Sequence, residues 1–406
     1  MNICICGPLN PYELSEFFPK ETNLPIINKA ASAVNTFAKE LLRKGHNVTV
    51  ITSDVPLDIE NDIIIKGTNI EIRIINSKPG IFLYHGLSRI YMVRRIKKHI
   101  TQVVGNVDVI HAQWTYDYAL ATKSFCNEIP VFCTVRDWCP YILSIQKGLK
   151  KLQWYLYYFL FLQVMKSKKI RFIANSQYTY DLIHKAYPLK NIPIICNPID
   201  KNYILEKSYK PDEIARFVTI SGIISEKRKN IITLLKAFKL FHEQMNNSEL
   251  IVIGGGGEPG SQLYNDFLSR GLVNGVNFVG YKSHSALIDI IDKSNCLVHP
   301  SIEETFGNIL LEGMARHKVV IGGKNSGAVP QVLGNGKYGI LCDVLDENSI
   351  FEAMKLSLDN NIERSLTKEA FEYLSNNFSS DVIVDKHIAL YELIIAKFHN
   401  KKRTLC

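Results

Sequence analysis

The sequence predicts an α/β protein built from two doubly wound parallel-sheet domains, and three observations lead to this prediction. The chain has 406 residues, which is too long for one ordinary hydrophobic core and suggests two domains. Short apolar runs of strand length alternate with segments of helical periodicity, which is typical of parallel sheets covered by helices. This alternation starts again near Arg216, so we expect two sheets of the same kind that face each other across a cleft.

The first domain begins with a βαβ unit. We expect a strand from Asn2 to Gly7, a helix from Ala31 to Lys44 that ends at the Gly45-His46 turn, and a strand over residues 47–52. Further strands are expected over residues 108–111, 131–134, 172–175 and 193–196. Their spacing leaves room for a helix between successive strands, so we expect a Rossmann-like sheet.

The second domain repeats this pattern after a polar connection. We expect the boundary after Asn197 to Asp200, where a strand ends and a lysine-rich stretch through Lys210-Pro211 follows. The expected elements are a strand over 216–221, a helix over 231–244, and strands over 249–253, 277–279 and 296–298. The predicted domains are therefore residues 1–200 and residues 205–379.

Composition narrows the class of protein. An apolar fraction of 46% with 21% charged residues is that of a soluble globular protein. The nine cysteines are scattered without a CxxC pair, so neither a zinc site nor a disulfide framework is expected. The first residues alternate like a buried strand and lack the basic leader of a signal peptide, which favours a reducing cytoplasm. The net charge is +9, but the sequence contains no recognised DNA- or RNA-binding module, so a nucleic-acid partner is not expected.

Two carboxylates flank an expected strand-to-helix turn near residue 307. Glu304 precedes the helix and Glu312 lies about one turn inside it, with seven residues between them. Both side chains can point into one cleft, where carboxylates accept paired hydrogen bonds from sugar hydroxyls. The first amides of the helix, at Gly307, Asn308 and Ile309, form a seat for phosphate. The alternative is that Glu304 caps the helix and Glu312 is a solvated helix residue.

This segment resembles the signature of family-4 retaining glycosyltransferases of the GT-B fold, of the bacterial surface-polysaccharide type. The resemblance rests on Glu304, Phe306-Gly307, residues 312–315 and the strand Val319-Val320. It implies that Glu304 holds the transferred sugar and that Glu312 holds the nucleotide ribose, with Phe306 in the donor-binding segment. It also implies that the final helix, over about 380–406, packs back on the first domain. His317-Lys318 and Gln331 depart from the family pattern.

A second constellation is the turn that opens the second domain. Gly222 frees the backbone at a strand end, and the cations Lys227, Arg228 and Lys229 precede the next helix. Cations there can neutralise the charge of a diphosphate leaving group. Related enzymes carry an arginine directly after the glycine, where this chain has Ile223, so we expect Arg228 or Lys229 to compensate. The alternative is a solvated helix start.

The glycine-rich loop 254–260 gives a competing signal. Gly255, Gly257 and Gly260 satisfy the GxGxxG pattern of dinucleotide-binding proteins, which makes an NAD enzyme a minor alternative. The next strand ends in Gly280-Tyr281 without the acidic residue that would hold an adenosine ribose. The family resemblance instead places Gly255 beside the donor nucleotide and Tyr281 along its base.

The first domain departs further from the family. Many relatives have His-Asp after the fourth strand, where this chain has Arg136-Asp137. Arg136 cannot act as a base, because its pKa is too high, but it can stabilise a phosphate. We therefore keep Arg136 and Asp137 as candidates for the catalytic site. His111, at an expected strand end, is either a substrate contact or a hydrogen-bonded structural histidine.

Two basic segments bear on the acceptor. Residues 87–100 read as a basic amphipathic helix, and residues 149–171 have an aromatic centre flanked by lysines that is too short to span a bilayer. Such segments suit the headgroup region of an anionic membrane. The alternative for 149–171 is a core helix with solvated ends.

Together these features predict a retaining glycosyltransferase. We expect it to move a hexose-type sugar from a UDP- or GDP-linked donor to a lipid-linked or lipopolysaccharide-type glycan, at the inner face of the cell membrane. No DxD pair is found, so we expect no metal and no cofactor. The open alternatives are an inactive nucleotide-sugar-binding scaffold, motivated by Ile223 and Arg136, and another GT-B enzyme such as an epimerase or a phosphorylase.

Overall fold

The computed structural model describes residues 1–27, 31–54, 61–76, 84–188, 191–205 and 213–403. The chain divides into two compact units. Unit 1 combines Met1–Pro198 with Ser380–Cys406, and unit 2 is Ile199–Ser379. The predicted connection at Lys210-Pro211 lies outside the described residues.

Unit 1 contains a seven-stranded sheet in the order β3-β4-β2-β1-β5-β6-β7. All neighbours are parallel except the β3–β4 hairpin at one edge. The strands are β1 (Asn2–Cys6), β2 (Asn47–Asp54), β3 (Ile63–Gly67), β4 (Ile70–Asn76), β5 (Val109–Ala112), β6 (Val131–Val135) and β7 (Arg171–Ala174).

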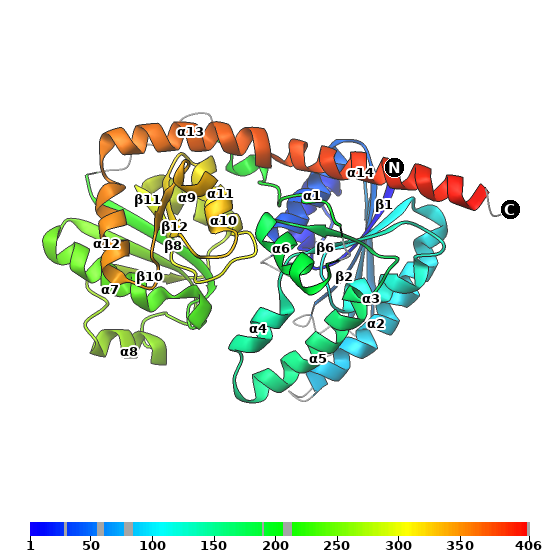
Figure 1. The fold of residues 1–406 in the computed structure, drawn as a ribbon, viewed down its shortest axis with the longest axis horizontal. Helices are drawn as coiled ribbons and strands as arrows, with labels where there is room; N and C mark the ends of the chain where they lie inside the picture. Colours follow the sequence, from blue (N-terminus) through cyan, green and yellow to red (C-terminus); the bar gives the residue numbers. More distant parts are fainter. Residues whose placement is uncertain (28–30, 55–60, 77–83, 189–190, 206–212, 404–406) are drawn as a thin grey trace. The chain divides into compact units, whose positions relative to one another are not determined.

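Helices cover both faces of this sheet (Figure 1). They are α1 (Ser32–Arg43), α2 (Tyr84–Val103), α3 (Asp117–Thr122), α4 (Cys139–Ile145), α5 (Gly148–Met165), α6 (Gln177–Ala186) and α14 (Ser380–Arg403). The C-terminal helix α14 joins unit 1 through α1, because Ser380 Oγ donates to Glu40 at 2.9 Å and Lys44 Nζ lies 2.7 Å from Asp385.

Unit 2 contains a six-stranded sheet, parallel throughout, in the order β10-β9-β8-β11-β12-β13. Its strands are β8 (Ala215–Ile223), β9 (Ser248–Gly255), β10 (Val276–Gly280), β11 (Cys296–His299), β12 (Val319–Gly323) and β13 (Ile340–Cys342). Its helices are α7 (Ile231–Gln244), α8 (Gln262–Ser269), α9 (His284–Lys293), α10 (Asn308–Ala315), α11 (Val329–Val332), α12 (Glu347–Leu356) and α13 (Asn360–Phe378).

The alternation of side chains along β1 shows why unit 1 has a core on each face of its sheet. Ile3 and Ile5 point into the cluster that contains α1 and α14, whereas Cys4 and Cys6 point into the cluster that contains α2 and α5. All four side chains are fully buried. The eight cysteines in the described part of the chain are all free thiols.

The prediction of two parallel-sheet α/β domains is confirmed. One expected strand is wrong: residues 193–196 contribute only an isolated bridge between Ile194 and Ala174, and Pro193 has no amide proton for a ladder. The strand at Val319-Val320 is present as β12, whereas β3, β4 and β13 were not predicted. β3 alternates between half-buried and exposed positions, which is a weak apolar signal.

Candidate functional site

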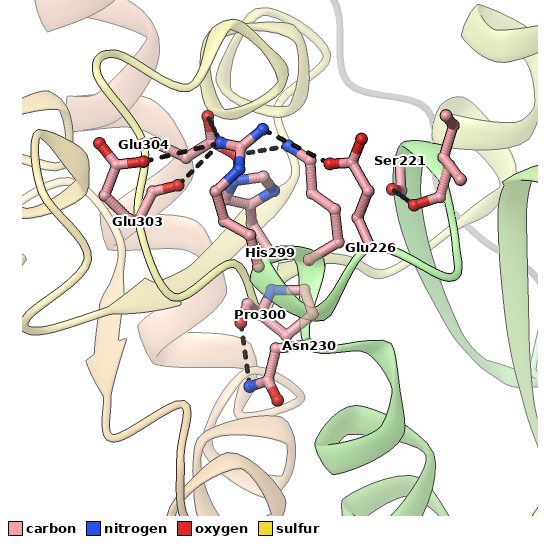
Figure 2. A network of polar contacts seen from close by, with 10 residues as sticks. Ser221, Glu226, Asn230, His299, Pro300, Glu303 and Glu304 are labelled. Atoms are coloured by element: carbon pink, nitrogen blue, oxygen red, sulfur yellow. Dashed lines mark hydrogen bonds and ion pairs between the residues drawn. The ribbon is translucent and has the colours of Figure 1, made fainter. Parts of the chain in front are cut away.

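Two loops meet at the carboxyl edge of the unit-2 sheet, because β8 and β11 are neighbouring parallel strands. A short 3-10 turn, Lys227–Lys229, follows β8, and residues 300–307 follow β11. The amide of Ile302 donates to the carbonyl of Arg228 at 2.8 Å. Asn230, in the left-handed conformation with φ 53°, donates its side-chain amide to Pro300 O at 3.2 Å (Figure 2). These bonds fix both loops against each other.

Glu304 lies where these loops meet (Figure 2), and two cations lie beside its carboxylate. Lys229 Nζ donates to Oε1 at 2.6 Å, and Arg228 Nη1 lies 3.5 Å from Oε2. His299 Nε2, at the end of β11, lies 3.2 Å from Oε1. Burial by itself raises the pKa of Glu304, but Lys229, His299 and Arg228 outweigh it and hold this pKa well below its ordinary value. Glu304 is therefore a carboxylate that only accepts hydrogen bonds at neutral pH.

Arg228 is held among acidic groups. Its Nη1 donates to the carbonyl of Glu303 at 3.0 Å and lies 3.8 Å from the Glu303 carboxylate, while Nη2 lies 3.7 Å from Glu226. The structure thus brings Arg228, Lys229 and Glu304 together, rather than leaving the two cations as a solvated helix start. His299 and Glu303 were not among the predicted site residues. The position of His299 at the carboxyl end of a buried strand was the signal that could have found it.

His299 is neutral at physiological pH. Burial lowers its pKa below the ordinary value, and this exceeds the raising effect of the neighbouring Glu304. The cationic partners of Glu304 are consequently Lys229 and Arg228.

Glu312 has a different environment on α10. The helix follows Gly307, whose φ of 88° favours glycine, and Phe306 anchors the turn by packing its ring against Phe378. Glu312 is buried, and burial raises its pKa to about 7, with a hydrogen bond from Tyr203 acting in the opposite direction. Asn308 and Ile309 begin the helix as expected. Tyr203, which was not anticipated, lies on a short turn just after the predicted domain boundary.

The glycine loop contacts Tyr281 closely. A Cβ atom built on Gly255 would lie 2.3 Å from Tyr281 Cε2, so the exposed ring rests directly on the glycine backbone. The amide of Ile224 donates to Gly255 O at 3.0 Å, which joins this loop to the end of β8. A Cβ atom on Gly222 would meet nothing within 4 Å, so this glycine borders open space. Gly222, Gly255 and Tyr281 therefore gather at one edge of unit 2.

The carboxyl edge of the unit-1 sheet carries Arg136 and Asp137 after β6. Arg136 donates from Nε and Nη2 to Gln113 Oε1 at 3.1 and 2.5 Å, and from Nη1 to Asn197 Oδ1 at 2.5 Å. Burial lowers its pKa to about 10, so it stays cationic at neutral pH. Asp137 Oδ2 accepts hydrogen bonds from Trp114 Nε1 at 2.8 Å and Tyr116 Oη at 3.0 Å.

His111 is a structural histidine of the unit-1 core. Its side chain is fully buried and forms hydrogen bonds with Tyr391 Oη and, at 2.8 Å, with Thr134 Oγ1. Burial holds its pKa well below the ordinary value. Of the two interpretations left open by the sequence, the geometry favours the structural one.

Two family models match the chain in succession. The model described as Glycosyltransferase Family 4 matches residues 30–203, and the model described as Glycosyl transferases group 1 matches residues 205–372. The chain belongs to the family-4 glycosyltransferases. It is a transferase, and some of its relatives are named as bacterial polysaccharide or O-antigen glycosyltransferases.

Curated relatives of this family-4 glycosyltransferase differ in how much of it they match. It is 22% identical over 407 residues to N-acetyl-alpha-D-glucosaminyl L-malate synthase of Bacillus anthracis, covering 94% of this chain and 98% of that protein. It is 28% identical over 204 residues to the capsular polysaccharide biosynthesis glycosyltransferase CapM of Staphylococcus aureus, covering 50% and 53%. It is 29% identical over 201 residues to the O-antigen chain mannosyltransferase RfbU of Salmonella typhimurium, covering 49% and 54%.

Solved structures establish the GT-B fold of the family-4 chain. Sucrose-phosphate synthase from Thermosynechococcus elongatus superposes with a TM-score of 0.74 at 16% identity, covering 98% of this chain and 100% of that one. WaaG, a glycosyltransferase involved in lipopolysaccharide biosynthesis, gives 0.68 at 14% identity over 95% and 98%. Anabaena HepE in complex with UDP and glucose gives 0.64 at 16% identity over 97% and 99%.

These family matches leave no support for the NAD alternative. Two glycines of the 254–260 loop allow close packing instead, Gly254 against Ser221 of β8 and Gly255 against Tyr281. Within the described ranges, no group of three or more His, Cys, Asp or Glu residues is arranged to hold a metal ion.

The basic segments of unit 1 are partly neutralised. On α2, Arg89 lies 2.8 Å from Asp117, and Arg95 is paired with Asp62. The segment itself contains no acid, as its sequence shows, and the acids that pair with these two residues come from other parts of the fold. Side chains of 84–88 lie outside the described set. No helix in the described ranges is both long and apolar enough to cross a bilayer.

Helix α5 has two apolar faces. Its inner face packs Leu160 and Phe161 into the core, with Trp154 and Tyr157 at the margin. Its outer face exposes four apolar side chains at three- or four-residue spacing: Leu149, Leu152, Tyr155 and Phe159. The core-helix interpretation thus holds for one face only.

Proposed function

We propose that this glycosyltransferase moves a sugar from a nucleoside-diphosphate donor to a lipid-linked or lipopolysaccharide-type glycan, with retention at the anomeric carbon. The observation that carries the proposal is the ionised Glu304 between Lys229 and Arg228, at the carboxyl edge of a parallel sheet. Ligands of open α/β sheets bind at this edge. A carboxylate beside two cations suits a ligand that carries both hydroxyls and phosphates.

The two cations supply the site for the diphosphate. Lys229 and Arg228 bind Glu304, and a diphosphate brought to the edge competes for the same cations. The first amides of α10, at Asn308 and Ile309, add donors that point out of the helix start. Glu304 then accepts hydrogen bonds from hydroxyls of the transferred sugar.

The nucleoside half of the donor is assigned to Glu312 and Tyr281. A buried carboxyl group with a pKa of about 7 is largely ionised above neutral pH and then accepts hydrogen bonds from the ribose diol. The exposed ring of Tyr281 on Gly255 offers a flat surface for the base. The HepE complex with UDP supports a uridine donor, with GDP as the alternative.

Retention is proposed to proceed by attack on the same face that the diphosphate leaves. Glu304 is a poor nucleophile because its carboxylate is bound by Lys229, Arg228 and His299. The bond from the anomeric carbon to the phosphate oxygen breaks as the bond to the acceptor oxygen forms, and the leaving phosphate takes the acceptor proton. Lys229 and Arg228 stabilise the negative charge that develops on the diphosphate.

A membrane-borne acceptor is supported by the outer face of α5. Four exposed apolar side chains lie beside Lys150 and Lys151, a combination that enters the headgroup region of an anionic leaflet. Polysaccharide and O-antigen glycosyltransferases among the relatives support the same acceptor class. We place the enzyme in the cytoplasm, peripherally on the inner face of the membrane.

A second candidate acceptor is a small hydroxy acid. The relative whose match spans nearly the whole chain is named for joining N-acetylglucosamine to L-malate, whereas the polysaccharide enzymes match about half of it. The guanidinium of Arg136 at the unit-1 edge is a suitable group for a carboxylate.

The donor is tested with UDP-, GDP-, ADP- and CMP-sugars, by thermal shift and by nucleotide release, on the wild type, Glu304→Ala and Glu312→Ala. We expect one nucleotide class to stabilise the wild type and slow nucleotide release to disappear in both variants. Stabilisation without release, with every acceptor tried, would favour an inactive scaffold. If no nucleotide stabilises the protein, the proposed donor site is wrong.

The acceptor is tested with the donor found in this way. Membrane extract and L-malate are supplied separately, and radiolabelled product is divided between organic and aqueous phases. Label in the organic phase supports the lipid-linked glycan, and label in a small anionic product supports the hydroxy acid. Proton NMR of the new linkage then distinguishes retention from inversion.

A further inference from the structure

A cavity of about 760 Å³ lies at the amino ends of β6 and β7. Phe132 and Arg171, which are register partners near the starts of these strands, both line it. The loop before β7 and the end of α6 form its sides, and Leu390 and Ile394 of α14 complete it. All of these residues belong to unit 1. Arg136 and Asp137 follow the carboxyl end of β6, so the cavity and these two residues lie at opposite edges of the unit-1 sheet.

The charges around this cavity have one sign. Lys166, Lys168 and Arg171 line it, and none of the described lining residues is acidic. Arg171 is half-buried, and its guanidinium forms no hydrogen bond or ion pair with any residue that the structure describes. Burial lowers the pKa of Arg171, because the charged form loses water without gaining an anion. A bound anion would supply the missing partner.

The neighbouring Lys169 points away from the cavity, unlike Lys166 and Lys168. Its Nζ donates to Asn127 at 2.6 Å and it does not line the cavity. Lys166 and Lys168, on either side of Ser167, do line it. Ser167 Oγ accepts hydrogen bonds from the amides of Lys169 and Ile170 at 3.3 and 3.2 Å. The loop conformation is therefore fixed by its own hydrogen bonds, with Lys166 and Lys168 on the cavity side.

The remaining walls are largely apolar. Phe132, Ile170 and Phe172 are almost completely buried, and Ile394 faces them from α14. A small anion such as free phosphate would satisfy the cations but leave this apolar surface in contact with water. The volume lies within the range of about 300 to 1,000 Å³ that is usual for small-molecule sites.

We propose that this cavity binds an amphipathic anion, an apolar chain that carries one phosphate or carboxylate group. Lys166, Lys168 and Arg171 hold the anionic group at the rim, and the chain lies against Phe132, Ile170 and Ile394. The ligand comes either from a bilayer, as an anionic lipid, or from solution. The site is separate from the proposed donor site, and its test does not use transferase activity.

Binding has a structural consequence within unit 1. The ligand would contact both α14, which ends the chain, and the segment around β7, more than 200 residues earlier. Because only the folded protein offers this cavity, ligand binding raises the melting temperature in proportion to the logarithm of ligand concentration.

The experiment measures binding of dodecyl phosphate, below its micelle concentration, to the full chain by calorimetry and thermal shift. Dodecyl maltoside is the uncharged comparison and inorganic phosphate is the chainless one. We expect dodecyl phosphate to bind at least about tenfold more tightly than either, a difference of about 1.4 kcal/mol. Arg171→Gln should weaken it about tenfold and Lys168→Gln about threefold. Lys20→Gln, which makes the same charge change at an exposed unit-1 position outside the cavity, should leave it unchanged.

Lys168 is exposed, so its variant tests the site even if Arg171→Gln fails to fold. Equal binding of dodecyl maltoside and dodecyl phosphate, or equal weakening by Lys20→Gln and Lys168→Gln, would overturn the proposal. Phosphatidylglycerol vesicles identify the source. If the cavity variants also lose vesicle binding, the ligand is a bilayer lipid, and if only dodecyl phosphate binding falls, it is a soluble amphiphile.

Discussion

The carboxyl edges of the two sheets hold their charged residues in different ways. In unit 2, the Glu304 carboxylate is bound by the cations Lys229 and Arg228. In unit 1, Asp137 accepts hydrogen bonds from the neutral donors Trp114 and Tyr116. The acceptors that Arg136 contacts are likewise neutral amide oxygens, from Gln113 and Asn197.

The two edges should therefore respond differently to a charged ligand. The ion pairs of unit 2 can be exchanged for ion pairs with a ligand, so a diphosphate can take over Lys229 and Arg228 while Glu304 turns to sugar hydroxyls. The neutral hydrogen bonds of unit 1 orient Asp137 without changing its charge. We therefore expect charge removal to be far more damaging at the unit-2 edge than at the unit-1 edge.

The largest expected effect compares Glu304→Gln with Asp137→Asn. Glutamine keeps the shape of Glu304 but removes the charge that Lys229 and two sugar hydroxyls require, at about 1.5 kcal/mol or more for each charged hydrogen bond. We expect the kcat/KM for sugar transfer to fall roughly 100-fold or more. Asparagine in place of Asp137 keeps an oxygen for Trp114 and Tyr116, so a loss of about tenfold or less is expected.

Steady-state kinetics with the identified donor measure both variants. The control is Glu347→Gln, which removes a partly exposed charge of unit 2 at the start of α12. Equal losses in the Glu304 and Asp137 variants would show that the two edges do not differ in their dependence on charge.

The same contrast explains what the sequence could reveal. The spacing of Glu304 and Glu312 and the strand before them predicted the edge on which chemistry is expected, because a turn after a buried strand is a local feature. The pairing of Lys229 with Glu304 was not visible, since 75 residues separate them and only the adjacency of β8 and β11 joins their loops. The acidic partners of Arg89 and Arg95 were missed for the same reason.

Burial was the other quantity that periodicity could not supply. Helix α5 showed an aromatic centre, but only packing decides that Phe161 is in the core while Phe159 is exposed. Nothing in the local sequence distinguished the environments of Glu304 and Glu312. Their opposite pKa shifts arise from Lys229 on one side and from burial on the other.

The pH dependence of stability should show this opposition within unit 2. Glu312 has a pKa of about 7 in the folded protein against an ordinary value of 4.5, so the folded state binds more protons between these values. Stability is therefore lost as the pH rises through this window. At pH 8 the loss is on the order of 3 kcal/mol. Thermal melts of Glu312→Gln from pH 5 to 8 should lack this decline, and a slope equal to that of the wild type would contradict the assignment.

Unit 1 should show the reverse slope, from the buried His387 on α14. Burial, with a smaller contribution from Arg136, lowers its pKa to about 3 from the ordinary 6.5, so the unfolded state binds more protons between these values. Stability is lost as the pH falls through this window, by on the order of 2 kcal/mol at pH 5. His387→Gln should flatten the melting curve series between pH 7 and 5, whereas His184→Gln on the exposed side of α6 should not. Identical slopes in the two variants would remove His387 as the cause.

The smallest expected effect is that of Gly255→Ala, at one of two glycines that lie against a side chain at the two edges. A Cβ atom on Gly255 would lie 2.3 Å from the ring of Tyr281, and one on Gly7 would lie 2.7 Å from Cβ of Gln113. Tyr281 is 64% exposed and can swing away, whereas Gln113 is buried and is held by Arg136. Gly255→Ala should therefore weaken donor binding only a few-fold, and Tyr281→Ala should abolish the additional effect of the alanine.

At Gly7 the neighbouring side chain cannot move away, so Gly7→Ala should lower the melting temperature of unit 1, as overpacking costs about 1 to 3 kcal/mol. Titration of the donor and thermal melts of the four variants measure both effects. A Gly255→Ala loss that persists without the Tyr281 ring would mean that this glycine approaches the nucleotide directly.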